Sequence, residues 1–147
     1  MRVTNTFDPI FDDRSEVLIL GSLPSVKSRE VNFYYGHPQN RFWKVVSTLV
    51  GRELPTSVTD KKKMLLENRI AIFDVIHSCE IDGAKDSSIR DVVPADVAGV
   101  LKRSNIKRIY ANGNKAWELY NKYCLPETGQ KACRLPSTSP ANAAYSM

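Results

Sequence analysis

The chain has 147 residues, of which 42% are hydrophobic and 25% charged, proportions typical of one globular domain with a full hydrophobic core. No apolar run approaches the roughly 20 residues that a membrane-spanning helix needs, and the N-terminal residues lack the apolar core of a signal peptide. The three cysteines, Cys79, Cys124 and Cys133, show no C-x-x-C spacing. We therefore expect free thiols in a reducing cytoplasm, with no membrane contact and no zinc or iron–sulfur site.

The net charge of +5 is unevenly distributed along the chain. From Gly99 to the C-terminus there are eight Lys and Arg residues and two acidic residues, which gives +6. The first 98 residues hold 13 basic and 14 acidic residues. A basic C-terminal third suits a polyanionic partner such as nucleic acid. Charge alone fits an ordinary solvated basic face equally well.

Short apolar runs alternate with helical patterns in chain order. Strands are predicted at 17–20, 69–76 and 106–113, with a short fourth strand at 131–140. Helices are predicted at 42–49, 60–68, 94–103 and 114–123. Thr59 is the expected cap of the second helix, and Pro94 is the expected first residue of the third. This alternation predicts an α/β domain with a mainly parallel sheet that helices cover on both faces.

Ligands of such sheets bind outside the carboxyl ends of the strands, and this rule selects four loops. They are 21–39, 74–91, 112–114 and 137–142. The loops contain no GxSxG elbow, P-loop or HExxH motif. They instead supply small residues, hydroxyls, amides and aromatic rings, which can approach phosphates, donate neutral hydrogen bonds and stack on a nucleobase.

Three motifs lie in or next to these loops: GSLPS (21–25), FYYGHPQNRFWKVV (33–46) and RLPSTSPAN (134–142). Together, and in this order, they resemble the uracil-DNA glycosylase superfamily over nearly the whole chain. The HPQNRFWKVV segment is similar to the mismatch-specific uracil/thymine-DNA glycosylases. The segments GSLPS, IFDVIHSCEIDGAKDSSIR and LPSTSPAN are more similar to the hypoxanthine-DNA glycosylase branch (family 6).

The resemblance implies a three-layer α/β/α sandwich on a four-stranded, mainly parallel central sheet, with residues 1–147 as a single domain. It implies a monofunctional DNA glycosylase in base excision repair, which flips a deaminated base out of double-stranded DNA and hydrolyses its N-glycosidic bond. Hypoxanthine is expected in preference to uracil. No cofactor or metal is implied, and we expect a monomer. Superfamily members continue into a last helix after the second motif, so the end at Met147 implies a truncated or very short final helix.

By this resemblance Asn40 is the catalytic residue, because it matches the amide of a Pro-x-Asn-x-Phe-Trp segment. The mismatch-specific branch carries its catalytic Asn two residues after the first glycine of the motif, where this chain has Leu23, which cannot polarise water. That departure counts against uracil-type catalysis. The residues leave a second interpretation of Asn40 open, a helix cap. Pro38 favours His37 as the cap, which would leave Asn40 in the first helical turn with its amide free.

The remaining site residues follow from the same resemblance. Substrate contacts are expected from Gly21, Ser22, Leu23, Tyr35 and His37, with the Tyr35 ring stacked on the flipped base. DNA contacts are expected from Ser25, Ser137, Thr138, Ser139, Pro140, Ala141 and Asn142. Structural interpretations stay open: turn chemistry for the first serines, a rim or core position for Tyr35, and an ST-turn for the C-terminal loop. Asp74 is interpreted as structural, because a carboxylate near DNA phosphates is unfavourable unless it is paired.

Two other functions remain compatible with these residues. A glycosylase-like fold can bind damaged or single-stranded nucleic acid without cleaving it, and Leu23 in the first motif keeps that alternative open. A small-nucleoside hydrolase is the third alternative, although it would have no use for the basic C-terminal third.

Overall fold

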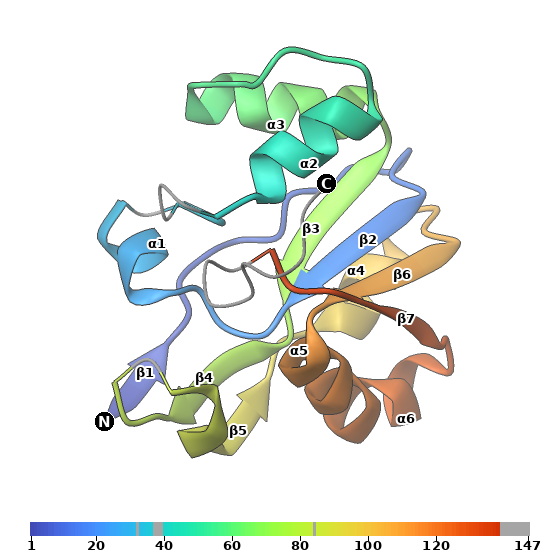
Figure 1. The fold of residues 1–147 in the computed structure, drawn as a ribbon. Helices are drawn as coiled ribbons and strands as arrows, with labels where there is room; N and C mark the ends of the chain where they lie inside the picture. The colour runs from blue at the N-terminus through green and yellow to red at the C-terminus, as the bar shows by residue number, and fades with distance from the viewer. Residues whose placement is uncertain (32, 37–39, 84, 139–147) are drawn as a thin grey trace.

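The structure, a computed structural model, describes residues 1–31, 33–36, 40–83 and 85–138. Within these residues a four-stranded, all-parallel sheet has the strand order β3-β2-β6-β7 (Figure 1). Its members are β2 (Val17–Gly21), β3 (Ile70–Asp74), β6 (Arg108–Asn112) and β7 (Ala132–Leu135). The predicted α/β class and the four predicted strands of this sheet are confirmed.

The β2 strand lies inside the sheet, between β3 and β6, which explains its run of consecutive apolar residues. Leu18 and Leu20 are fully buried. The parallel register sets Gly21 opposite Asp74, at the last pair of the β2–β3 ladder. Because all four strands run in the same direction, their carboxyl ends meet at one edge of the sheet.

Helices cover both faces of the sheet, so the predicted three-layer sandwich is confirmed (Figure 1). The first face carries α2 (Phe42–Leu49) and α3 (Val58–Glu67). The opposite face carries α4 (Val97–Lys102), α5 (Asn114–Leu119), a π-helical turn (Tyr120–Cys124) and α6 (Leu125–Thr128). The short α1 (Val26–Val31) follows β2.

Each helical layer forms its own hydrophobic cluster with the sheet. On the α4–α5 side, Leu18 and Leu20 pack with Val97, Val100 and Tyr120. On the α2–α3 side, the cluster contains Ile72, Phe42, Trp43, Val46 and Leu65. Burial of one such side chain contributes about 2 kcal/mol, so the two clusters are the main support for the sheet edge at which the four loops meet.

A second, antiparallel sheet was not predicted. It has the order β1-β4-β5, with β1 (Arg2–Thr4), β4 (Ile76–Glu80) and β5 (Arg90–Pro94), and a single 3₁₀ turn (Asp86–Ser88) precedes β5. The predicted strand 69–76 is divided at Val75, whose backbone N–H donates to the carbonyl of Gly21 at 2.8 Å. After that bond the chain leaves the parallel sheet and pairs with β1 and β5 instead.

Three predicted helix starts or ends were wrong. The helix α3 is capped by Ser57, not Thr59, and the Ser57 hydroxyl accepts the N–H of Asp60 at 3.0 Å. Pro94 ends β5, and α4 begins at Val97 after the cap Asp96. The predicted helix 114–123 changes at Tyr120 from α-helical to π-helical hydrogen bonding. Local propensity located each helix, and tertiary contacts determined its ends.

Among the described residues, every helix is too short or too polar to span a lipid bilayer.

The cap of α3 gives a direct test of the fold. Replacement of Ser57 by Ala removes the oxygen that accepts the Asp60 N–H, and should lower the free energy of unfolding by about 1 kcal/mol. Thr59→Ala is the matched control, because Thr59 is exposed in the first turn and is not the cap. It should change stability by less than about 0.5 kcal/mol. Urea unfolding of both variants measures the difference, and a larger loss for Thr59→Ala would contradict the assignment.

Candidate active site

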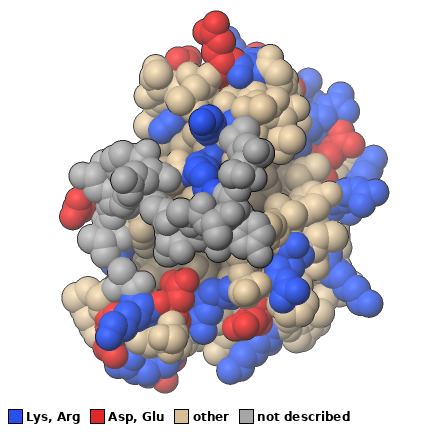
Figure 2. All heavy atoms as spheres, in the orientation of Figure 1, with Lys and Arg blue, Asp and Glu red and all other residues tan. Residues whose placement is uncertain are grey.

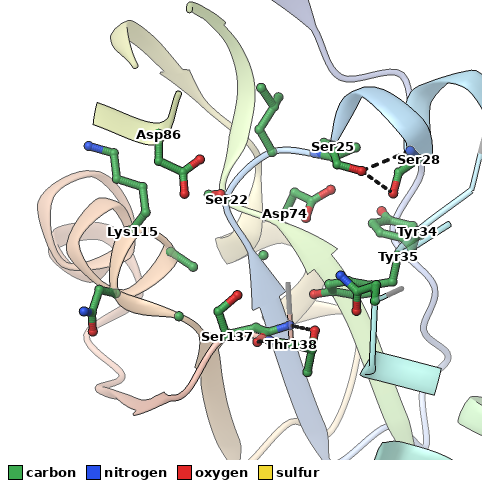
Figure 3. A pocket seen from close by; sticks show the side chains of 18 of the residues that line it. Ser22, Ser25, Ser28, Tyr34, Tyr35, Asp74, Asp86, Lys115, Ser137 and Thr138 are labelled. Atoms are coloured by element: carbon green, nitrogen blue, oxygen red, sulfur yellow. Dashed lines mark hydrogen bonds between the residues drawn. The ribbon is translucent and has the colours of Figure 1, made fainter. Parts of the chain in front are cut away.

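A pocket of about 730 Å³ opens where the carboxyl ends of the parallel strands meet (Figure 3). Gly21 and Ser22 reach it from β2, Asp74 from β3, and Asn112 from β6. Residues 137 and 138, which follow β7, close another side. The four loops selected by the sheet rule therefore converge on one cavity.

Asp74 lies in the pocket with only 3% of its surface exposed. Its Oδ2 accepts a hydrogen bond from the Asn5 amide at 3.1 Å. Gly21 faces the other oxygen: a Cβ at Gly21 would lie 2.5 Å from Asp74 Oδ1, closer than atoms can approach. The missing side chain of Gly21 thus makes room for the buried carboxyl group.

Burial raises the pKa of Asp74 from 3.8 to about 7, because a carboxylate loses its hydration inside the protein, and the hydrogen bond from Asn5 offsets part of the shift. Near neutral pH the group is present in both forms. It can therefore accept a hydrogen bond as a carboxylate or donate one as a carboxylic acid. Strongly shifted groups in clefts are concentrated at functional sites.

Tyr35 stands beside Asp74 (Figure 3). Its backbone has φ of +52°, which is uncommon for a non-glycine residue. Its ring is stacked on Phe42, with centroids 3.9 Å apart and planes 10° apart. The hydroxyl is buried and has no hydrogen-bond partner among the described residues. Burial, and then the charge of Asp74, raise the pKa of Tyr35 well above its ordinary value, so the hydroxyl stays neutral.

The segment that carries Tyr35 is held from three directions. The Trp43 indole donates to the carbonyl of Tyr34 at 3.1 Å, and the Tyr34 hydroxyl donates to the carbonyl of Asp8 at 2.7 Å. The Gly36 N–H donates to the buried Ser28 hydroxyl at 2.9 Å. Each bond ties the aromatic segment to a different element. The ring of Tyr35 therefore has a fixed position in the pocket wall.

Asn40 lines the pocket, but its predicted place in the first helical turn was wrong. The helix α2 begins at Phe42 with Arg41 as the cap residue, so Asn40 lies before the helix and not in its first turn. Its Oδ1 accepts the N–H of Phe42 at 2.9 Å. This bond from residue i+2 forms an Asx-turn just before the helix and is not an N-cap bond, because Arg41 is the cap residue. The amide nitrogen of Asn40 has no hydrogen bond within the described part of the chain. His37 and Pro38, on which the earlier expectation depended, lie outside the described residues.

Thr138 joins the loop after β7 to the end of β6 and to the residue before α2. The Asn112 side chain forms two hydrogen bonds with it: Nδ2 donates to the hydroxyl at 3.0 Å, and Oδ1 accepts the backbone N–H at 3.1 Å. The Arg41 N–H donates to the carbonyl of Thr138 at 3.1 Å. Gly113, with φ of +104°, allows the turn after β6 and approaches Ser137 closely. The C-terminal loop is therefore fixed to both β6 and α2.

In the loop after β2, Ser25 and Leu23 make contacts that stabilise the fold, in addition to the ligand contacts predicted for them. The Ser25 hydroxyl accepts the N–H of Ser28 at 3.1 Å, the geometry of a cap on α1. Leu23 lies in the pocket wall and packs against the core. The far wall, which the sequence did not predict, is formed by Asp86 and Lys115 (Figure 3). Burial raises the pKa of Asp86, and the charge of Lys115 opposes that shift.

The pocket brings together eight of the predicted site residues: Gly21, Ser22, Leu23, Ser25, Tyr35, Asn40, Ser137 and Thr138. His37, Ser139, Pro140, Ala141 and Asn142 lie outside the described residues. Asp74 and Asn112 were absent from the predicted site. Each is a polar residue that ends an apolar strand, and this signal could have identified both. No group of three metal-ligating side chains occurs in the described part of the chain.

Comparison with known proteins agrees with this arrangement. A sequence model of the uracil DNA glycosylase superfamily matches residues 9–147. The chain belongs to the uracil-DNA glycosylase superfamily. Within this superfamily it is similar to a hypoxanthine DNA glycosylase of Methanosarcina acetivorans, with 37% identity over 142 residues, covering 95% of this chain and 89% of that protein. A hypoxanthine DNA glycosylase of Methanosarcina barkeri is 34% identical over 115 residues, 76% of this chain and 72% of the relative.

A solved superfamily structure has the same fold. The solution NMR structure of a candidate uracil DNA glycosylase from Methanosarcina acetivorans aligns with a TM-score of 0.85 and 36% identity. The alignment covers 100% of this chain and 91% of that one. The arrangement of sheet and helices is therefore that of a superfamily member.

The buried carboxyl of Asp74 predicts an unusual pH dependence of stability. Its folded pKa, about 7, is above the ordinary 3.8, so between these values the folded state binds more protons. Stability from this group is complete below pH 4 and is lost as the pH rises through 7, by up to about 4 kcal/mol. Asp74→Asn removes the titration. Relative to the parent, the variant should gain stability progressively from pH 4 to 7.

Urea unfolding of the parent and Asp74→Asn at pH 4 to 8 measures this difference. Taking the difference cancels the titration of the other groups, such as Glu16, whose pKa is lowered by its hydrogen bond with Arg69. A stability difference that is independent of pH would show that Asp74 is not buried as described.

Proposed function

We propose that this chain is a monofunctional DNA glycosylase that hydrolyses the N-glycosidic bond of a deaminated base flipped out of double-stranded DNA. The observation that carries the proposal is the pocket at the carboxyl edge of the sheet, which sets a neutral amide, a buried carboxyl group and an aromatic ring around one cavity. Hypoxanthine is the preferred base, because both curated relatives are named hypoxanthine DNA glycosylases.

The flipped base enters between Tyr35 and Asn40. The Tyr35 ring is supported on one face by Phe42, which leaves its other face for stacking on a nucleobase. The Asn40 oxygen is held by the N–H of Phe42, so the amide plane is fixed and its nitrogen remains as a donor. A fixed donor and a fixed ring orient the base without any reorganisation during the reaction.

The chemistry follows from the charges that develop. Cleavage of the glycosidic bond builds positive charge on the sugar and negative charge on the departing base. Asp74, when protonated, and Tyr35, which stays neutral, are buried donors beside the pocket. Donors of this kind stabilise a departing anion. DNA phosphates favour the protonated form of Asp74 further, because like charges repel.

The charge distribution supports DNA as the substrate. In the view of Figure 2, Lys and Arg side chains lie over the lower right of the molecule, where Figure 1 places β6, β7 and α5. Residues from Gly99 onward carry a net +6. The proposal includes a single domain over residues 1–147 that acts as a monomer. A chromosomal substrate would place it in the cytoplasm with the nucleoid, if the source is prokaryotic.

An excision assay tests the activity. Labelled duplexes with a single hypoxanthine, a single uracil or no lesion are incubated with micromolar protein, and abasic sites are cleaved with alkali. We expect product from hypoxanthine, less from uracil and none from the control duplex. No product from either lesion would overturn the proposal.

Variants of Asn40 distinguish a structural role before α2 from a role in catalysis. Asn40→Ala should lower single-turnover excision by about 100-fold or more, because a fixed donor to the transition state is lost, while duplex binding changes little. Asn40→Asp keeps the oxygen that accepts the Phe42 N–H and lacks the amide nitrogen, so it should unfold like the parent. Excision by Asn40→Ala at the parental rate would show that Asn40 has only a structural role.

A second candidate function is a binding module that recognises damaged or single-stranded nucleic acid without cleavage. The aliphatic Leu23 favours this alternative, because it cannot activate water, and the Asn40 oxygen already accepts one hydrogen bond from Phe42. It predicts salt-dependent binding of the lesion duplex with no turnover by the parent. Measured together, binding and excision by the parent distinguish the two functions.

A further inference from the structure

Beyond the pocket, a cation on the edge strand β7 lies over an aromatic ring. Arg134 is exposed on β7, and its guanidinium carbon lies 5.0 Å from the ring centroid of Trp117 on α5. Trp117 is half-buried, so the ring that supports the cation has a fixed position. The pair therefore presents a pre-ordered positive charge at the first residue of the C-terminal motif.

The charge of Arg134 is not neutralised within the described residues. Several other arginines pair with carboxylates there: Arg52 with Glu67 at 2.9 Å, and Arg69 with Glu16 at 2.6 Å. Arg134 has no such ion pair among the described residues, although Glu118 follows Trp117 on the same helix. A guanidinium that stacks on an aromatic ring keeps its N–H groups at the rim for a second partner.

The position of Arg134 relates it to the pocket. The β6–β7 register sets Arg134 opposite Ala111, one residue before Asn112, whose side chain holds Thr138. Ser137 is the third residue after Arg134, about 10 Å along an extended chain. Successive nucleotides of a DNA strand rise about 3.4 Å. A strand whose lesion enters the pocket thus has phosphates within reach of Arg134, about one to three nucleotides from the flipped base.

We propose that Arg134, held over Trp117, binds a backbone phosphate of the lesion-bearing DNA strand beside the flipped nucleotide. The inference rests on the proposed function for the path of the DNA strand. The preordered cation without an ion pair among the described residues is an observation of the structure alone. A planar guanidinium binds phosphate through two parallel hydrogen bonds. The contact fixes the register of the strand and carries no sequence information. Lys131, just before β7, and Lys115, in the pocket wall, carry the same sign of charge.

A purely structural role is the competing explanation. A cation–π pair at an exposed site contributes about 0.5–1 kcal/mol to stability. In that case replacement of Arg134 would change the free energy of unfolding and leave the salt dependence of DNA binding unaltered. A phosphate contact has the opposite signature, because each neutralised phosphate releases counterions.

Fluorescence anisotropy on labelled duplexes, with and without one hypoxanthine, tests the proposal between 50 and 200 mM KCl. The variants are Arg134→Ala, Arg134→Lys and Lys63→Ala, the last being an exposed cation on α3 that matches the charge change. Arg134→Ala should weaken binding about 5- to 10-fold and reduce the slope of log K against log salt by about 0.9. Arg134→Lys should keep the slope with weaker binding, and Lys63→Ala should match the parent.

Equal slopes for Arg134→Ala, Lys63→Ala and the parent would overturn the proposal, as would the absence of measurable DNA binding by the parent. Equal loss of slope in both Ala variants would also overturn it, because the effect would then be one of net charge. Binding is read independently of excision. A parent that binds with the expected slopes but excises nothing would refute the proposed glycosylase activity and leave the phosphate contact supported.

Discussion

The carboxyl group of Asp74 is packed against the bare backbone of Gly21 and beside the Tyr35 hydroxyl, and the form of the pocket depends on this contact. Any side chain at residue 21 would collide with Asp74 Oδ1 and then with Tyr35. The parallel register that sets Gly21 opposite Asp74 therefore cannot slip without filling the site. Burial of the carboxyl group destabilises the fold at neutral pH, and the hydrophobic clusters on both faces of the sheet offset that loss. A buried ionisable group that lowers the stability of the fold and lies in a cleft is typical of a functional site.

The structural role of Asn40 and its proposed role in catalysis need not compete. The bond from the Phe42 N–H fixes one end of the amide, and this orients the nitrogen at its other end. The same helix fixes the aromatic wall, since Phe42 stacks on Tyr35 and the Trp43 indole bonds the backbone of Tyr34. One buried helix start thus positions both the donor and the ring. A site assembled from side chains that are already held loses little conformational entropy when a base arrives.

The sequence predicted what depends on local pattern, and failed where long-range contacts decide. Apolar runs located the four parallel strands, and the 42–49 stripe located α2 within its observed bounds. The bend at Val75 was not predictable, because a bond to Gly21, far away in the chain, causes it. The same applies to Pro94, which ends a strand because its neighbours pair with β4. Asp74 was interpreted as structural because an unpaired carboxylate near DNA phosphates is unfavourable, and the sequence does not reveal that burial against Gly21 raises the pKa of this group. Motif order identified the pocket loops correctly, since parallel topology brings strand ends together whatever the loop details.

The lack of a base at Asn40 and at Leu23 is compatible with hydrolysis for a physical reason. In a bond cleavage that separates charge, water attacks late and needs little activation, so most of the barrier lies in stabilising the departing base and the sugar cation. Neutral donors serve the base, and DNA phosphates serve the cation. A permanently ionised carboxylate at Asp74 would repel the departing anion, whereas a group with a pKa of about 7 can remain protonated next to DNA. In the proposed reaction, burial of Asp74, which lowers the stability of the fold, supplies the required protonation state, and no base is needed at Leu23 in the first motif.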